Sequence, residues 1–121
     1  MSRILAVDDE PHILKLVAFS LKAGGFDVIE SSDGLSAIDI AAAEQPDLIL
    51  MDVMMPVIDG FEACRRLKEN PETKDIPVVM LTAKTQLSEQ KQGLDSGAAG
   101  YICKPFTPKD LVAQVQEFLG E

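Results

Sequence analysis

The chain alternates short apolar runs with longer segments in which apolar residues recur at helical spacing. Each short run is apolar on consecutive residues, which is typical of a strand buried on both faces of a sheet. Each long segment repeats its apolar residues every three or four positions, which is typical of an amphipathic helix. The runs that predict strands are residues 4–7, 26–29, 48–51, 78–81 and 101–103.

Proline and glycine mark the ends of the predicted helices. Pro11 suits a first helical turn, the glycine pair at 24–25 stops the helix that follows, and Pro46 ends the second helix. A fourth helix is predicted over residues 86–96, but it has few large apolar residues and contains Gly93, so we expect it to be weak. The apolar residues of the other four predicted helices are Ile13, Leu14, Val17 and Leu21, then Leu35, Ile38, Ala41 and Ala42, then Phe61, Cys64 and Leu67, and finally Leu111, Val112, Val115, Phe118 and Leu119.

The regular alternation of strands and helices predicts a doubly wound α/β fold. Parallel strands need crossover helices between them, and these crossovers are right-handed in nearly all proteins. We therefore expect a five-stranded parallel sheet with helices on both faces, in a single domain over residues 1–121. In such folds the functional site lies at the carboxyl ends of the strands.

The composition of the chain limits the classes of binding partner that we expect. The chain has 20 acidic and 11 basic residues and a formal net charge of −9, so we expect no direct binding to nucleic acid or to anionic membranes. No apolar run reaches the roughly 20 residues of a membrane helix, and no signal peptide precedes the first predicted strand, so we expect a cytoplasmic protein. Cys64 and Cys103 are interpreted as small buried thiols, and His12, the sole histidine, as a surface residue.

Polar residues follow four of the five predicted strands. Asp8 and Asp9 come after the first strand, Asp52 after the third, Thr82 after the fourth and Lys104 after the fifth. The carboxyl ends of parallel strands meet at one edge of a sheet, so these side chains are expected to converge there. A single polar residue at a strand end usually just meets water, but three acids, a hydroxyl and a lysine at the same edge indicate a site.

Electrostatics indicates what such a site would bind. Two carboxylates about 5 Å apart repel by roughly 3 kcal/mol at an effective dielectric constant near 20, so three of them need a cation. Oxygen-only ligands favour Mg²⁺, which we expect Asp9 and Asp52 to hold, with Asp8 nearby or acting through water. A carboxylate beside that ion can attack phosphorus and form an aspartyl phosphate. Lys104 and Thr82 would then neutralise the remaining phosphoryl oxygens.

The whole chain resembles the receiver domain of two-component response regulators, including the chemotaxis regulators. The resemblance implies a flavodoxin-like sheet with strand order 2-1-3-4-5. The matching motifs are Val-Asp-Asp-Glu at 7–10, Asp-Val-Met-Met-Pro at 52–56, Asp-Gly at 59–60, Leu-Thr-Ala at 81–83 and Lys-Pro-Phe at 104–106.

The resemblance also implies roles for individual residues. It makes Asp52 the phosphoacceptor and assigns Mg²⁺ to Asp8, Asp9, Asp52 and the Met54 backbone carbonyl. Thr82 and Lys104 would contact the phosphoryl group, and the bond from Lys104 to Pro105 is expected to be cis. Such a protein is a signalling switch, which assists its own phosphotransfer and slow autodephosphorylation but does not turn over external substrates.

The same resemblance implies partners. A histidine kinase or a histidine phosphotransfer protein would donate the phosphoryl group. A downstream protein or a second copy would bind the face formed by the fourth helix, the fifth strand and the fifth helix. Tyr101 matches the family's switch aromatic, although an ordinary half-buried strand tyrosine explains it equally well. Met54 and Lys84 are expected to tune the phosphoryl lifetime, and the unusual pairs at 57–58 and 99–100 to alter the partner surface.

Three alternatives are weighed against this interpretation. A hydrolase of the haloacid dehalogenase type would carry a second aspartate two residues after the nucleophile, where this chain has Met54. A flavodoxin-like FMN carrier would have a loop rich in Ser, Thr and Gly after the first strand, whereas the acidic residues at 8–10 would repel the phosphate. A degenerate receiver that only binds protein stays possible, but the complete set of functional residues does not require it.

Overall fold

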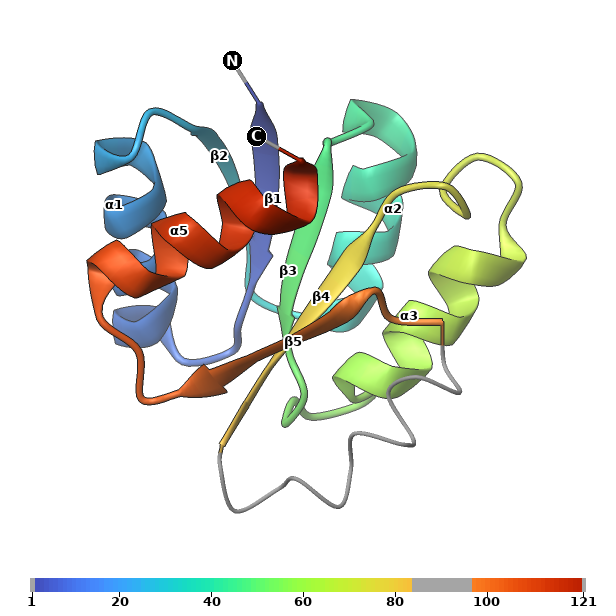
Figure 1. The fold of residues 1–121 in the computed structure, drawn as a ribbon. Coiled ribbons are helices and arrows are strands. Elements are labelled where there is room, and N and C mark those ends of the chain that lie inside the picture. The colour runs from blue at the N-terminus through green and yellow to red at the C-terminus, as the bar shows by residue number, and fades with distance from the viewer. Residues whose placement is uncertain (1, 84–96, 121) are drawn as a thin grey trace.

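Five parallel strands form a single sheet at the centre of the molecule (Figure 1). The computed structural model describes residues 2–83 and 97–120. The strand order is β2-β1-β3-β4-β5, which confirms the predicted fold class. The strands are β1 (Arg3–Val7), β2 (Asp27–Ser31), β3 (Leu48–Asp52), β4 (Val78–Ala83) and β5 (Gly100–Lys104).

Helices cover both faces of the sheet. In Figure 1, α1 and α5 lie on one face, and α2 and α3 lie on the other. The weak helix predicted over residues 86–96 lies outside the described residues. The helices are α1 (Pro11–Ala23), α2 (Gly34–Glu44), α3 (Gly60–Glu69) and α5 (Pro108–Leu119).

The sheet separates two hydrophobic cores, because successive strand residues point to opposite faces. One core lies beneath α2 and α3, and the other lies beneath α1 and α5. The strand residues of the first core are Leu5, Val7, Ile49, Met51, Val78 and Met80. Those of the second core are Ile4, Ala6, Leu48, Leu50, Val79, Leu81 and Ile102.

Local sequence signals fix where the helices begin and end. The side chains of Asp33 and Asp59 accept hydrogen bonds from backbone N–H groups in the first turns of α2 and α3, and Thr107 does the same for α5. Gly24 caps α1, and Gly25 follows with φ 95°, a conformation that glycine adopts without strain. Ordinary helix caps therefore account for the helix ends that the sequence predicted.

Several predicted positions differ in detail from the structure. Leu35 is exposed, because α2 packs against the sheet through the small side chains of Ala37 and Ala41. Cys64 is buried as predicted, whereas Cys103 is only half-buried, because it lies near the end of β5, at the outer edge of the sheet. His12 lies at the surface, as predicted. None of the helices in the described residues is long and apolar enough to cross a bilayer.

Gly60 is where helix α3 approaches the end of β3 most closely. A Cβ atom at this position would clash with the Met80 Cε atom and would lie 2.5 Å from the backbone oxygen of Asp52. We predict that Gly60→Ala lowers the free energy of unfolding by about 2 kcal/mol, because the backbone of Asp52 has to shift. Urea unfolding monitored by circular dichroism measures this loss.

Gly34 offers a matched control, since it is also the first residue of a helix that follows an aspartate cap. A Cβ atom there would lie 2.9 Å from Cγ1 and 3.1 Å from Cδ1 of Ile58 and 3.3 Å from Cβ of Ala63, so it would meet side-chain atoms and no backbone atom of another segment. Because only side-chain atoms have to shift, and no backbone oxygen of a strand, Gly34→Ala should cost about 1 kcal/mol or less. Equal losses for the two variants would contradict the role given to the Asp52 backbone.

Candidate functional site at the carboxyl edge of the sheet

The strand ends bring the predicted site residues to one edge of the sheet. Asp8 directly follows β1, and Asp52 is the last residue of β3. These strands are neighbours, with Val7 paired to Met51, so the two aspartates lie side by side. Thr82 and Lys104 lie at the ends of the next two strands, where Ala83 pairs with Lys104.

Three carboxylates converge at this edge. One oxygen from each of Asp8, Asp9 and Asp52 lies within 4.8 Å of the others. The side chains of Asp8 and Asp52 are almost completely buried, with relative exposures of 2% and 5%, whereas Asp9 is half-buried. The convergence that the sequence predicted is therefore present.

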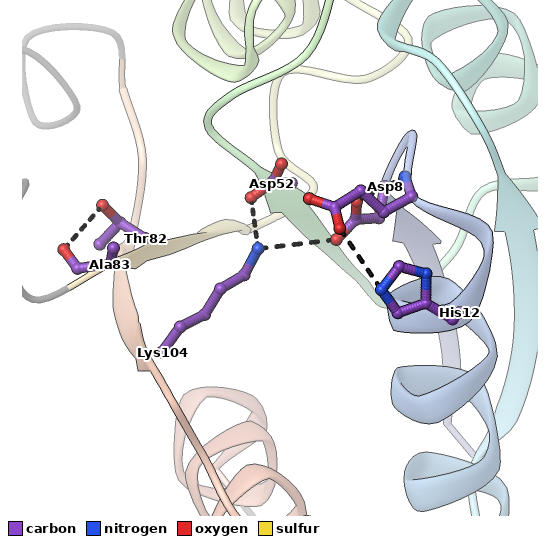
Figure 2. A network of polar contacts seen from close by, with 7 residues as sticks. Asp8, His12, Asp52, Thr82, Ala83 and Lys104 are labelled. Atoms are coloured by element: carbon purple, nitrogen blue, oxygen red, sulfur yellow. Dashed lines mark hydrogen bonds and ion pairs between the residues drawn. The ribbon is translucent and has the colours of Figure 1, made fainter.

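Lys104 connects the carboxylates across the sheet. Its side chain passes the end of β4, a span of two strand spacings or about 9.6 Å, and donates a hydrogen bond of 2.8 Å from Nζ to Asp52 Oδ1 (Figure 2). The same Nζ atom lies 3.7 Å from Asp8 Oδ2. In the described part of the chain, three carboxylates thus face one ammonium group, which leaves two negative charges without compensation when all three are ionised.

The two oxygens of Asp8 have different surroundings. Oδ1 accepts a 3.0 Å hydrogen bond from the backbone N–H of Glu10, a contact that the sequence pattern did not reveal. Oδ2 is buried and accepts no hydrogen bond from the described residues, because the Lys104 ammonium at 3.7 Å is too distant to donate one. A buried carboxylate oxygen without a donor is costly, and it is what a cation site at this position requires.

Burial controls the titration of the cluster. It raises the pKa of Asp52 above the ordinary carboxyl value, and it outweighs the hydrogen bond and the charge of Lys104, which act in the opposite direction. Burial likewise raises the pKa of Asp8, against the hydrogen bond from Glu10 and the charge of Lys104. Burial alone would lower the pKa of Lys104, but its hydrogen bond to Asp52 and the nearby carboxylates raise that pKa on balance.

The donor set fits a hard divalent cation. The three carboxylates supply only oxygen, which is the ligand type that Mg²⁺ prefers. The described residues around the cluster contribute no imidazole or thiolate that would favour a softer metal. A divalent ion would also compensate the two unbalanced charges and give Asp8 Oδ2 a partner.

Thr82 lies near the end of β4, and Tyr101 lies on β5, three residues before Lys104. The Thr82 hydroxyl donates a 3.4 Å hydrogen bond to the Ala83 carbonyl, and Figure 2 shows it pointing away from Asp52. Tyr101 is half-buried on β5 and packs against the core beneath α2 and α3. Both interpretations of Tyr101, switch or ordinary strand residue, therefore stay open. The predicted cis bond from Lys104 to Pro105 is present.

Comparison with known proteins decides the family. The sequence model described as the response regulator receiver domain matches residues 4–116. The chain belongs to this family. Membership agrees with the observed strand order and with a phosphoacceptor function, and it favours neither the hydrolase nor the degenerate receiver. It is consistent with a signalling protein, because the matching relatives are regulators.

Individual relatives extend the comparison. The receiver is 45% identical over 119 residues to the "DNA-binding dual master transcriptional regulator RpaA" of Synechocystis sp., covering 98% of the receiver and 49% of that protein. It matches the chemotaxis response regulator CheY4 of Vibrio cholerae with a TM-score of 0.91 and 35% identity, covering 98% of both chains. The receiver spans about half the length of the curated relatives that it matches.

One structural neighbour bears on the metal. The receiver domain of the sensor histidine kinase PA1611 from Pseudomonas aeruginosa PAO1 matches with a TM-score of 0.90 and 30% identity, covering 99% of this receiver and 98% of that chain. That structure is described as having a magnesium ion coordinated in its active site cleft. The acidic cluster of the present receiver is of a kind that such an ion would occupy.

Removing one buried charge tests the electrostatics of the cluster. In metal-free buffer, Asp8→Asn is predicted to raise the free energy of unfolding by about 1 to 2 kcal/mol near neutral pH. A carboxyl group whose pKa is higher in the folded protein than in the unfolded protein stabilises the fold when it is protonated. This contribution is complete at pH values below the ordinary carboxyl pKa, and it is lost as the pH rises through the pKa of the folded state. The advantage of the variant should therefore shrink as pH falls. Urea unfolding over a range of pH measures it.

Asp27→Asn is the control for this experiment, because Asp27 is an exposed carboxylate on β2. Its effect should stay within about 0.5 kcal/mol at every pH. A loss of stability in Asp8→Asn at neutral pH would show that burial does not dominate the titration of the cluster.

Proposed function

We propose that this receiver accepts a phosphoryl group on Asp52, with Mg²⁺ as cofactor, from a histidine kinase or a histidine phosphotransfer protein. The observation that supports this most strongly is the charge balance of the site. Three converging carboxylates, two of them buried, are accompanied by one ammonium group. An arrangement that leaves two negative charges unbalanced is unfavourable by itself and becomes favourable once a divalent cation is bound.

The proposed metal ligands are Asp8, Asp9, Asp52 and the backbone carbonyl of Met54. The acidic cluster and the orphaned Oδ2 atom of Asp8 support the carboxylate part of this set. Met54 lies in the loop after β3, two residues beyond Asp52, and its side chain is exposed. When bound, the ion supplies positive charge that stabilises the equatorial oxygens of a phosphoryl group in transfer.

The protein residues would carry out the transfer as follows. A carboxylate oxygen of Asp52 attacks phosphorus, and the P–N bond to the donor imidazole breaks. The electron pair of that bond leaves with the imidazole nitrogen. Lys104, already 2.8 Å from Asp52 Oδ1, is placed to compensate the charge of the incoming phosphoryl group. The deep burial of Asp52 excludes bulk water, which slows hydrolysis of the product.

The same residues could convert phosphorylation into a conformational change. A phosphoryl group adds about −1.5 to −2 charge units, which would draw the Thr82 hydroxyl away from the Ala83 carbonyl. In the register of β4 and β5, Thr82 pairs with Cys103, so Tyr101 lies one pleat away on the same face of the sheet. A shift of a two-state switch from 1:99 to 99:1 takes about 5.5 kcal/mol, and several charge-assisted hydrogen bonds of about 1.5–3 kcal/mol each would suffice.

Output would pass through protein contacts on the face that contains β5 and α5. Some relatives are named as DNA-binding or transcriptional regulators, and this receiver covers about half of their length. We propose that the acidic receiver itself does not contact DNA and acts through a downstream protein or a second copy. A cytoplasmic location suits a protein that receives phosphoryl groups from kinases of this kind.

The central prediction concerns phosphorylation by a small donor. Incubation with acetyl phosphate and Mg²⁺ should add one phosphoryl group, detectable by intact-mass spectrometry and localised to Asp52 by peptide mapping. EDTA should abolish the adduct. Asp52→Asn should lose it, whereas Asp39→Asn, which changes an exposed carboxylate on α2, should retain it. An adduct that persists in Asp52→Asn would refute the assignment.

A second prediction concerns the switch. Tyr101 is the sole tyrosine of the chain, so 3-fluorotyrosine incorporation gives one fluorine NMR signal that reports on this ring alone. Phosphorylation should shift that signal in the wild type. Thr82→Ala should still take up the phosphoryl group but should lose most of the shift. An unchanged shift in phosphorylated Thr82→Ala would mean that Thr82 does not couple the site to Tyr101.

A further inference from the structure

The loop between β3 and α3 contains a strained residue. Val57 has a φ of 71°, in the left-handed region that β-branched side chains adopt only under constraint. Its side chain is 88% exposed, the largest exposure among the exposed large hydrophobic residues of the described chain. Burial of the side chain therefore does not offset the backbone strain.

Val57 lies between two buried residues. Met55 and Ile58 are each 8% exposed and belong to the core beneath α2 and α3. The chain bends at residues 56–58, between these two anchors, and Pro56 fixes its own φ near −65°. A proline followed by a residue with φ 71° has the φ pattern of a type II turn, whose third position normally takes glycine or asparagine.

The strained loop is attached directly to the backbone of Asp52. Val53 donates a hydrogen bond to the Leu81 carbonyl, and Gly60 donates one of 2.9 Å to the Val53 carbonyl, which closes the loop. Gly60 also packs against the Asp52 backbone oxygen so closely that a Cβ atom would lie 2.5 Å from it. Val57 therefore lies in a short closed loop that contains Met54 and begins directly after Asp52.

The described residues include a second non-glycine residue with positive φ, which provides a contrast. Gln45 has a φ of 49° and caps the end of α2. Its side-chain amide donates hydrogen bonds to the carbonyls of Ala42 and Glu72, at 3.2 Å and 2.8 Å, so local contacts compensate its conformation. Val57 also has a positive φ, but its aliphatic side chain cannot make such hydrogen bonds.

We propose that Val57 is a positioning residue for the metal site. A valine confined to the left-handed region samples a narrow range of backbone angles, whereas glycine would sample a wide one. The protein thus gives up stability in this turn and gains a stiff loop that holds Asp52 and the Met54 carbonyl in place for the divalent ion. The inference rests on the proposed function, because it concerns the same metal site.

Two substitutions of Val57 distinguish the effect of backbone strain from the effect of loop stiffness. Val57→Gly should raise the unfolding temperature in EDTA by about 2–5 °C, because the strain is released. It should also raise the Kd for Mg²⁺ about three- to tenfold in isothermal titration calorimetry, because binding then has to order a looser loop. Val57→Asn, which accepts positive φ but keeps a Cβ atom, should raise the unfolding temperature while its Kd stays within about twofold of the wild type.

Gln45→Gly is the matched control, because it frees a left-handed backbone position at the opposite edge of the sheet. Its Kd for Mg²⁺ should equal that of the wild type. A Val57→Gly variant with unchanged affinity, or with a lower unfolding temperature, would overturn the proposal while wild-type Mg²⁺ binding left the proposed function intact. A wild-type protein that bound no Mg²⁺ would overturn the proposed function, and the positioning role with it.

Discussion

The receiver depends on one electrostatic constraint, which is that three carboxylates, two of them buried, share a single ammonium group among the described residues. Lys104 bonds to Asp52 and approaches Asp8, but it cannot satisfy both acids and Asp9 as well. The fold therefore holds its own site in an unfavourable charge state, and the two cores supply the stability that tolerates this. Binding of a cation and addition of a phosphoryl group would each change this charge balance. Both would act on the carboxylate oxygens and on the Lys104 ammonium group.

The parallel sheet makes this arrangement possible. Every strand delivers its last residue to one edge, so the acids, the hydroxyl and the lysine come together although they are far apart in the sequence. The side chains that build the two cores lie along the strands and behind the site. The residues of the site are therefore different from the residues that pack the interior. Gly60, at the start of α3, packs against both the core residue Met80 and the backbone of the site residue Asp52.

Much of this could be predicted from the sequence, since strand order and strand ends follow from apolar patterning and the resemblance to receivers. The convergence of Asp8, Asp9 and Asp52 follows from the same premise. The orphaned oxygen of Asp8 and the conformation of Val57 could not be predicted, because they depend on side-chain reach and on how Met55 and Ile58 are anchored. The exposure of Leu35 was also missed, because helical spacing does not show which way a small-residue face will turn.

The alternation of side chains along β5 gives its residues three different surroundings. Ile102 lies in one core, Tyr101 packs against the other, and Lys104 ends the strand at the carboxylates. An insertion or deletion of one residue inside this strand would exchange those environments, turning the phenol toward an aliphatic interior and withdrawing the ammonium group from its partners. Strand β5 therefore has to keep its length, because the positions of Ile102, Tyr101 and Lys104 are all set by the same short stretch of backbone.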